Sequence, residues 1–178
     1  MLNKRAADEF GPILERMNDW GRQRMGGMRV GPTQAERAST AKGLDVVPVP
    51  VERPEEVEGS LTDLKQIRHD ALLLVNDSVF LGNADRILTY CSERRLPTMF
   101  STADWVMKGG LMSYEPDPTQ MYRRAAAYVL KVLGGTKPSD LPVEQPTMFW
   151  LAVNAKVGKA LGLTIPQSLL VRADELIE

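Results

Sequence analysis

Residues 70–76 read DALLLVN, a continuous apolar run between polar residues, and this run decides the fold. A strand made only of apolar residues is suited to burial on both faces, which is what a parallel sheet covered by helices requires. We therefore expect residues 70–76 to form a strand of a parallel sheet.

Segments on either side of this run alternate between extended and helical patterns. Extended apolar segments fall at 44–51 (LDVVPVPV), 96–100 and 110–114, and helical segments fall at 54–69, 78–95 and 101–109. Strands that alternate with helices at this spacing predict βαβ units. We therefore expect an α/β fold, a doubly wound parallel sheet with helices on both faces.

The last third of the chain predicts a helix, a strand and a second helical region. Residues 119–133 repeat apolar side chains at helical spacing, 148–154 (MFWLAVN) is an apolar strand, and Asn154 is placed to cap a helix over 155–162. A turn and a helix are expected to close the chain at 164–177. The chain then divides into a helical segment at 1–27, an α/β lobe at 28–114 and a C-terminal segment at 115–178.

The composition is that of an ordinary soluble globular protein. The 178 residues are 43% apolar and 25% charged, and 22 basic against 23 acidic residues give a net charge of -1. This balance argues against a nucleic-acid-binding surface and against recruitment to an anionic membrane. No apolar run approaches the roughly 20 residues that a membrane helix needs, so we expect no membrane insertion.

The first 20 residues contain basic side chains but lack the apolar core of a signal peptide. We therefore expect no secretory signal in this chain, which would stay in the cytoplasm if Met1 is its native start. Its single cysteine, Cys91, rules out an internal disulfide.

Motifs of catalysis and of metal binding are missing from the sequence. It contains no P-loop, no metalloprotease motif and no G-x-S-x-G nucleophile elbow, and GGMRVG at 26–31 follows no strand of useful length. We interpret His69 as a solvated histidine at a helix end and Cys91 as a small buried hydrophobic residue. Metal-ligating side chains are not clustered. The sequence therefore predicts a protein that is not an enzyme and needs no metal or cofactor.

Polar residues follow the ends of three predicted strands. Ligands of open parallel sheets bind outside the carboxyl ends of the strands. We expect Asp77 to pair with an ammonium or hydroxyl group, the hydroxyl side chains to contact a carboxylate or another polar edge, and Tyr114 to stack on an apolar part of a small ligand. The expected ligand-binding residues are Asn76, Asp77, Ser78, Ser101, Thr102, Ser113 and Tyr114. The alternative for Asn76, Ser101 and Thr102 is that they only cap helices.

The stretch 109–178 resembles a known family. It combines the strand GGLMSYEPD, a helix containing Arg-Arg-Ala-Ala that ends at Gly and Lys-Pro, and the run LPVEQPT followed by a strand, an Asn-capped helix and ALGLTIP. These features are similar to the C-terminal part of ABC-transporter substrate-binding proteins, a family with tryptophan- and tyrosine-binding members. DALLLVNDSVF and LPTMFSTADWV fit the same family, so the resemblance is strong over 69–178 and looser over 28–68.

The resemblance implies the fold and function of a periplasmic binding protein. Such proteins have two α/β lobes that are joined by crossing strands and close on a ligand by a hinge motion. By resemblance, residues 113–116, including Glu115, form a hinge crossing, and the helix from Thr119 and the strand 148–154 belong with the other lobe. The implied function is to bind a small polar or amino-acid-like ligand in the periplasm, without chemistry, and to deliver it to an ABC permease.

Compared with this family, we expect this chain to lack most of a first lobe and the signal peptide. The helix 119–133 and the strand 148–154 would then expose an apolar surface, which we expect a homodimer, a domain swap or the N-terminal helix to cover. Two alternative functions remain. An oligomerising α/β module without a functional cleft would use an exposed face at 148–151, and an enzyme would need Asp77 as its acid or nucleophile.

Overall fold

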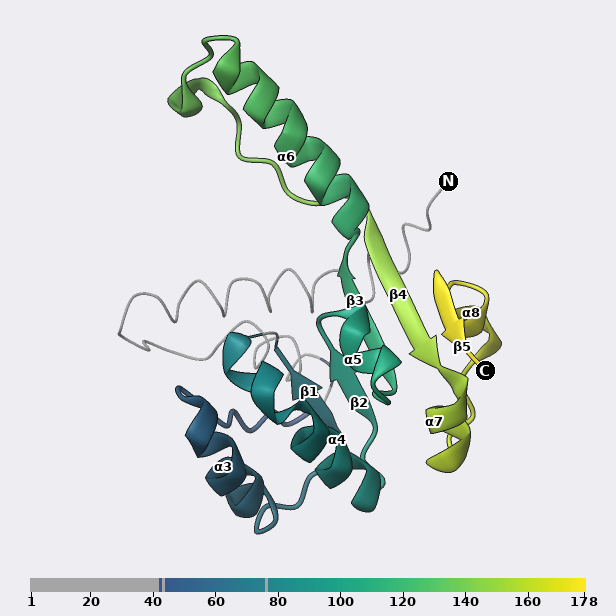
Figure 1. Cartoon of the computed structure of the whole chain (residues 1–178). Coiled ribbons are helices and arrows are strands. Elements are labelled where there is room, and N and C mark those ends of the chain that lie inside the picture. The colour runs from purple at the N-terminus through teal and green to yellow at the C-terminus, as the bar shows by residue number, and fades with distance from the viewer. Residues whose placement is uncertain (1–41, 43, 76) are drawn as a thin grey trace.

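A computed structural model describes residues 42, 44–75 and 77–178 of the chain. The described residues form one mixed sheet of five strands in the order β1-β2-β3-β4-β5 (Figure 1). Neighbouring strands are parallel except β3 and β4, which are antiparallel. The strands are β1 (Leu72–Leu74), β2 (Thr98–Phe100), β3 (Met112–Pro116), β4 (Phe149–Asn154) and β5 (Glu175–Ile177).

Helices connect these strands, and short polar side chains begin several of them. The side chain of Asp77 accepts a hydrogen bond from the amide of Val79, and that of Asn154 accepts one from the amide of Val157, as predicted for the cap at Asn154. The helical elements are η1 (Pro54–Glu56), α3 (Val57–Leu64), η2 (Ser78–Asn83), α4 (Ala84–Glu93), α5 (Ala103–Met107), α6 (Pro118–Leu133), η3 (Pro138–Asp140), α7 (Ala155–Ala160) and α8 (Gln167–Leu170).

One face of the sheet is covered by α3, α4 and α5. Their apolar side chains form a buried cluster around Phe100, which is fully buried and stacks on Trp105 with ring centroids 4.9 Å apart. Gly110 lies so close to this pair that a Cβ atom there would overlap the Phe100 ring and the carbonyl oxygen of Trp105. This packing fixes α5 against the ends of β2 and β3.

The opposite face of the sheet is covered by the segment around α8. Tyr114 on β3 and Leu151 and Val153 on β4 form a second buried cluster, against which Ile165 and Leu170 pack. Because helices lie on both faces of a mostly parallel sheet, the predicted α/β fold is confirmed.

The strand predicted at 44–51 was wrong. Among the described residues of this segment none belongs to a strand, and its last residue, Val51, is buried in the first cluster instead. Pro48 and Pro50 explain the difference, because proline has no amide proton to donate to a strand ladder.

The helix predicted to close the chain was also wrong over its second half. Only α8 forms, and the chain then continues as β5 alongside β4. Asp174 directs this turn, because its carboxylate accepts from the amide of Leu151 at 2.8 Å while its own amide donates to the Leu151 carbonyl at 2.9 Å. Parallel pairing with β4 then continues from Glu175.

The strand at 70–76 forms as β1 but is not buried on both faces. Leu72 and Leu74 pack against the first cluster, whereas Leu73 is 37% exposed and belongs to neither cluster. In the described part of the chain β1 is the edge strand of the sheet and pairs with β2.

The strand β4 lies in the same sheet as β1, β2 and β3, which corrects its assignment to another lobe. It pairs with β3 from Met112 opposite Val153 to Pro116 opposite Phe149. Of the exposed face expected at 148–151, only Met148 is exposed, at 37%, because Phe149 and Trp150 are partly buried and Leu151 is buried. Antiparallel addition next to β3 and packing against α8 account for the burial.

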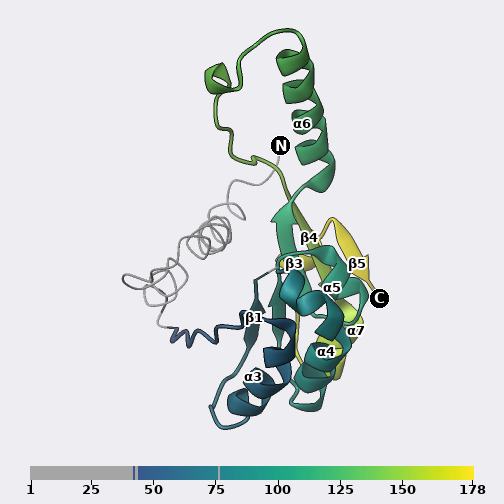
Figure 2. The ribbon, with the colours of Figure 1, turned by 60° about the vertical axis from the view of Figure 1, so that its left-hand side comes forward.

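Residues 118–148, here called the arm, leave the sheet between β3 and β4 and project from it (Figures 1 and 2). The arm consists of α6, a turn with η3 and an extended return segment. None of its residues is buried. The return segment is held to α6 by an ion pair between Arg124 and Glu144 and by a hydrogen bond from the Tyr128 hydroxyl to the Pro142 carbonyl at 2.6 Å.

The helix predicted at 119–133 is confirmed as α6, but its apolar stripe is uncovered within the described structure. Tyr122 is 78% exposed, Val129 55% and Leu133 79%. Large exposed apolar stripes of this kind mark surfaces that contact another body.

Candidate ligand-binding site

The carboxyl ends of β1, β2 and β3 lie at the same end of the sheet, because these strands are parallel neighbours (Figure 1). Phe149, the first residue of the antiparallel β4, lies at the same end of the sheet, opposite Pro116. The loops after β1 and β2 and the last residues of β3 together form the candidate site. The predicted ligand residue Asn76 lies outside the described residues.

The loop after β1 is organised by Asp77. One carboxylate oxygen accepts from the amide of Val79 at 3.1 Å and from the hydroxyl of Ser78 at 3.3 Å. Asp77 is partly buried and Ser78 is exposed. A carboxylate that is held in this way has a fixed direction.

The loop after β2 carries two hydroxyl groups that do not cap α5. The Oγ of Ser101 is buried and has no hydrogen-bond partner within the described structure. Thr102 is the N-cap residue of α5, yet its side chain makes no capping hydrogen bond. The capping alternative for these two residues is therefore not what the structure contains. A buried hydroxyl without a partner costs free energy, so Ser101 calls for an explanation.

Ser113 and Tyr114 point to opposite faces of β3, and both are buried. Ser113 is fully buried, and its Oγ has no partner among the described residues. Tyr114 is 7% exposed and stacks on Phe149 with ring centroids 5.1 Å apart. Burial raises the pKa of the Tyr114 phenol, the charge of Asp174 raises it further and that of Arg172 lowers it. The structure therefore places these two residues inside the sheet and not with the more accessible loop residues.

Glu115 was not among the predicted ligand residues, although it links two of the strand ends. Its carboxylate oxygen accepts a hydrogen bond of 2.6 Å from the amide of Ala103, the first residue of α5. Burial raises the pKa of the Glu115 carboxyl, the bond from Ala103 lowers it, and the charge of Asp104 raises it. In the sequence, Glu115 is one of the polar residues at the end of the strand predicted at 110–114, and it precedes a proline in the predicted crossing.

The candidate site is acidic. Its described loop residues, at 75, 77–78, 101–104 and 115–118, include no lysine or arginine. They include four carboxylates, which belong to Asp77, Asp104, Glu115 and Asp117. Asp117 is committed to capping α6, since its carboxylate accepts from the amides of Thr119 and Gln120. Such surroundings favour a ligand with an ammonium group or hydrogen-bond donors over an anionic ligand.

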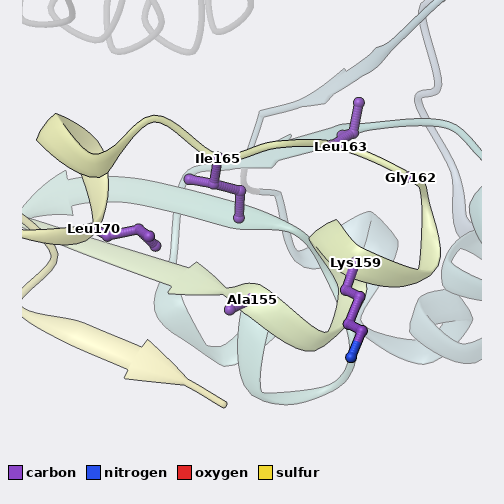
Figure 3. Close-up of a pocket in the computed structure, with 6 residues that line it drawn as sticks. All are labelled: Ala155, Lys159, Gly162, Leu163, Ile165 and Leu170. Carbon is purple, nitrogen blue, oxygen red and sulfur yellow. The ribbon is translucent and has the colours of Figure 1, made fainter.

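A shallow depression of about 340 Å³ lies elsewhere, beside α7 (Figure 3). It follows the carboxyl end of the antiparallel β4, at the end of the sheet opposite to the candidate site. Its lining is Ala155, Lys159, Gly162, Leu163, Ile165 and Leu170. This depression contains no residue of the strand-end loops.

Two side chains of a kind that often takes part in catalysis, Cys91 and His69, are held by burial and by hydrogen bonds. Cys91 is buried, and burial raises the pKa of its thiol to about 12, so it is no nucleophile at neutral pH. His69 is partly buried, which differs from the solvated histidine predicted, because its ring bonds to the Tyr90 hydroxyl at 3.2 Å and to the Ile67 carbonyl at 2.7 Å. Within the described residues, no group of His, Cys, Asp or Glu could hold a metal, and no helix is long and apolar enough to cross a membrane.

Comparison with protein families gives a match that covers most of the chain. The family described as "ABC transporter substrate binding protein" matches residues 33–177. No curated protein matches the chain.

Solved structures that resemble the chain are matched over about half of their own length. The ABC domain in complex with L-Trp from Streptococcus pneumonia is 25% identical with a TM-score of 0.73, and the match covers 81% of this chain and 50% of that one. A conserved domain protein from Vibrio cholerae is 20% identical with a TM-score of 0.72, and the match covers 80% and 48%.

The third structure is the ligand-free, open form of a substrate-binding protein with adhesive properties from Clostridium difficile. It is 20% identical with a TM-score of 0.59, over 82% of this chain and 48% of that one. The chain therefore spans about half the length of the structures it matches.

Proposed function

We propose, from the premise that the chain belongs to the ABC transporter substrate-binding protein family, that it captures a small polar or amino-acid-like ligand for an ABC importer. The family resemblance predicted from the sequence is confirmed. Members of this family bind substrates without transforming them, and we propose the same for this chain.

One observation supports ligand capture at the strand ends more than any other. Polar residues follow the carboxyl ends of the neighbouring parallel strands β1 and β2, and the buried Oγ of Ser101 there lacks a partner in the described structure. Ligands of open α/β sheets bind outside the carboxyl ends of the strands. A ligand that accepts or donates a hydrogen bond to Ser101 would remove the cost of the unpartnered hydroxyl.

The chemistry of the loops suggests how the ligand would be held. We expect Asp77 to receive an ammonium or hydroxyl group, and the hydroxyls of Ser78, Ser101 and Thr102 to contact its polar edges. Asn76 would join them from the same loop. On one face of β3 the Tyr114 ring, stacked on Phe149, would offer an apolar surface, and on the opposite face Ser113 would offer its hydroxyl.

Asp77 allows a test that separates ligand binding from folding. Asn caps helices as well as Asp does, so Asp77→Asn keeps the bond from Val79 and removes the charge. We expect calorimetric titration with the standard L-amino acids, beginning with L-tryptophan, to show binding by the wild-type chain. In Asp77→Asn the affinity should fall by roughly 10- to 100-fold, the value of a lost charge-assisted contact.

The control is Asp63→Asn, an exposed acidic position on α3 that changes net charge by the same amount. It should bind like the wild type, and both variants should melt within a few degrees of it. Equal affinity of Asp77→Asn and wild type would remove Asp77 from the site. Absence of binding to every amino acid would overturn the amino-acid-like ligand.

The partner and compartment follow from the family. Family members are typically periplasmic or extracellular and deliver substrates to a permease. We propose the same for this protein. An ABC permease as partner would be tested by co-purification of tagged chain and permease from membranes in the presence of ligand.

A second candidate function is oligomerisation through the arm. The exposed stripe of Tyr122, Val129 and Leu133 favours it, because an apolar surface of this kind is commonly covered by a second copy. A homodimer through this stripe would be disrupted by Tyr122→Asp. Light scattering at several concentrations would read the mass, and a monomer at all concentrations would exclude the dimer.

A further inference from the structure

The first turn of α5 is capped from a distant strand and not by its own N-cap residue. Thr102 occupies the N-cap position with extended backbone but makes no side-chain cap. Threonine at this position ordinarily accepts a bond from an amide of the first turn. Here the amide of Ala103 donates to the Glu115 carboxylate at 2.6 Å, across 12 residues of chain.

The carboxylate of Glu115 lies in surroundings that disfavour its negative charge. Glu115 is only partly exposed, burial raises the pKa of its carboxyl, and Asp104 from α5 adds a like charge. On β4 its partner in the ladder is Trp150, which carries no charge. An N-cap side chain accepts from the second or third amide of a helix, so a cap by Thr102 would still leave the Ala103 amide, the first, to another acceptor.

The bond between Glu115 and Ala103 acts on the loop that precedes α5. The loop held by this bond carries two hydroxyls: that of Thr102 makes no capping bond, and the Oγ of Ser101 is buried without a partner in the described structure. Both hydroxyls belong to the proposed ligand site. We propose that Glu115 is a positioning residue, which holds the start of α5 through the Ala103 amide and so keeps the hydroxyls of Ser101 and Thr102 in place for the ligand.

The position of Glu115 also ties this loop to the chain crossing. The next residue, Pro116, is the last of β3, and Asp117 caps α6 of the arm. A displacement of the crossing would therefore pull on the loop 101–103 through the bond between Glu115 and Ala103. Glu115 thus connects the ligand-contacting loop to the segment through which the chain leaves the sheet.

Three substitutions separate the possible roles of Glu115. Glu115→Gln keeps an acceptor oxygen at the same reach but removes the charge, Glu115→Ala removes the acceptor, and Glu115→Asp shortens the side chain. Glu93→Ala, at an exposed position on α4, is the control for loss of a glutamate.

Hydrogen exchange of the Ala103 amide, read by NMR, tests the inference without any ligand. We expect Ala103 to exchange at least about fivefold faster in Glu115→Ala and Glu115→Asp than in wild type, which corresponds to loss of a typical cap. Glu115→Gln and Glu93→Ala should stay within twofold of wild type. The resonances of Ser101 and Thr102 should shift only in Glu115→Ala and Glu115→Asp. Unchanged protection of Ala103 in Glu115→Ala would overturn the inference.

Titration with L-tryptophan then tests the link to binding, and here the inference rests on the proposed function. We expect Glu115→Gln to retain the wild-type affinity and Glu115→Ala to lose about 5- to 10-fold, the equivalent of one cap. Equal losses in both variants would make Glu115 a direct charged contact and overturn the positioning role, as would full affinity in Glu115→Ala. If wild type binds no amino acid, the proposed ligand fails, while the exchange result still decides whether Glu115 sets the loop.

Discussion

The helices of the sheet region are packed against other parts of the chain, whereas in the described part of the chain the helix of the arm is not. In the sheet region, α4 buries four residues, among them Ile87 and Tyr90, against the strands. The longer α6 of the arm buries none, although its sequence is equally amphipathic. Helical periodicity therefore predicts a helix in both regions, but it does not reveal whether the apolar face has a partner within the chain.

The largest expected difference between the two regions is in the cost of losing a large side chain. Phe100→Ala should lower the free energy of unfolding by about 3–4 kcal/mol, because it leaves a cavity beside Trp105. Leu133→Ala on the arm should change it by less than about 0.5 kcal/mol, because Leu133 is exposed. Urea unfolding followed by circular dichroism measures both. Similar losses would mean that the arm packs against something in the free protein.

Glycine replacements provide a second, smaller contrast. Gly110→Ala should cost about 2 kcal/mol, because its methyl group would overlap the Phe100 ring and the Trp105 carbonyl oxygen. At Gly134 on the arm, the nearest atoms to an added methyl are the Leu130 and Lys131 carbonyl oxygens at 3.3 and 3.4 Å, so Gly134→Ala should cost well under about 1 kcal/mol. The melting temperatures of the two variants give the comparison, and a lower value for Gly134→Ala would contradict it.

The smallest expected effect is in the titration of one glutamate from each region. Burial raises the pKa of Glu115, so the contribution of this group to stability is present at low pH and is lost as pH rises through its folded pKa. The side-chain hydrogen bond from Arg124 lowers the pKa of Glu144, so its contribution is present at neutral pH and is lost as pH falls through a folded pKa below 4.5.

Acidification from neutral pH should therefore protonate Glu115 first and detach the return segment of the arm from α6 last. Carboxyl-carbon NMR resolves the two titrations, with Glu144→Gln and Glu115→Gln to assign the signals. A titration of Glu144 above that of Glu115 would show that the contacts of one or both glutamates differ in solution.

The sequence predicted the elements of the sheet region better than their arrangement. The apolar runs that became β1, β2, β3 and β4 were recognised because each is bounded by polar or turn residues. The strand β5 was missed, because its three residues form a strand only through the bonds that Asp174 makes to Leu151. The antiparallel direction of β4 was also missed, since a connection as long as the arm permits either direction.

The candidate site was predictable in position but not in detail. The rule that ligands bind at strand carboxyl ends selected Asp77, Ser101 and Thr102 from order along the chain alone. The burial of Ser113 could not be predicted, because it depends on packing between β3 and the neighbouring layer. The role of Glu115 was equally hidden, since its partner Ala103 lies on another element.

Native mass spectrometry of the purified chain tests most directly whether the strand ends, and not the arm, carry the function. The account predicts a small-molecule adduct that is lost in Asp77→Asn and retained in Tyr122→Asp, because Tyr122 lies on the exposed stripe of the arm. A dimer without adduct, which Tyr122→Asp converts to monomer, would contradict ligand capture and assign the function to the arm.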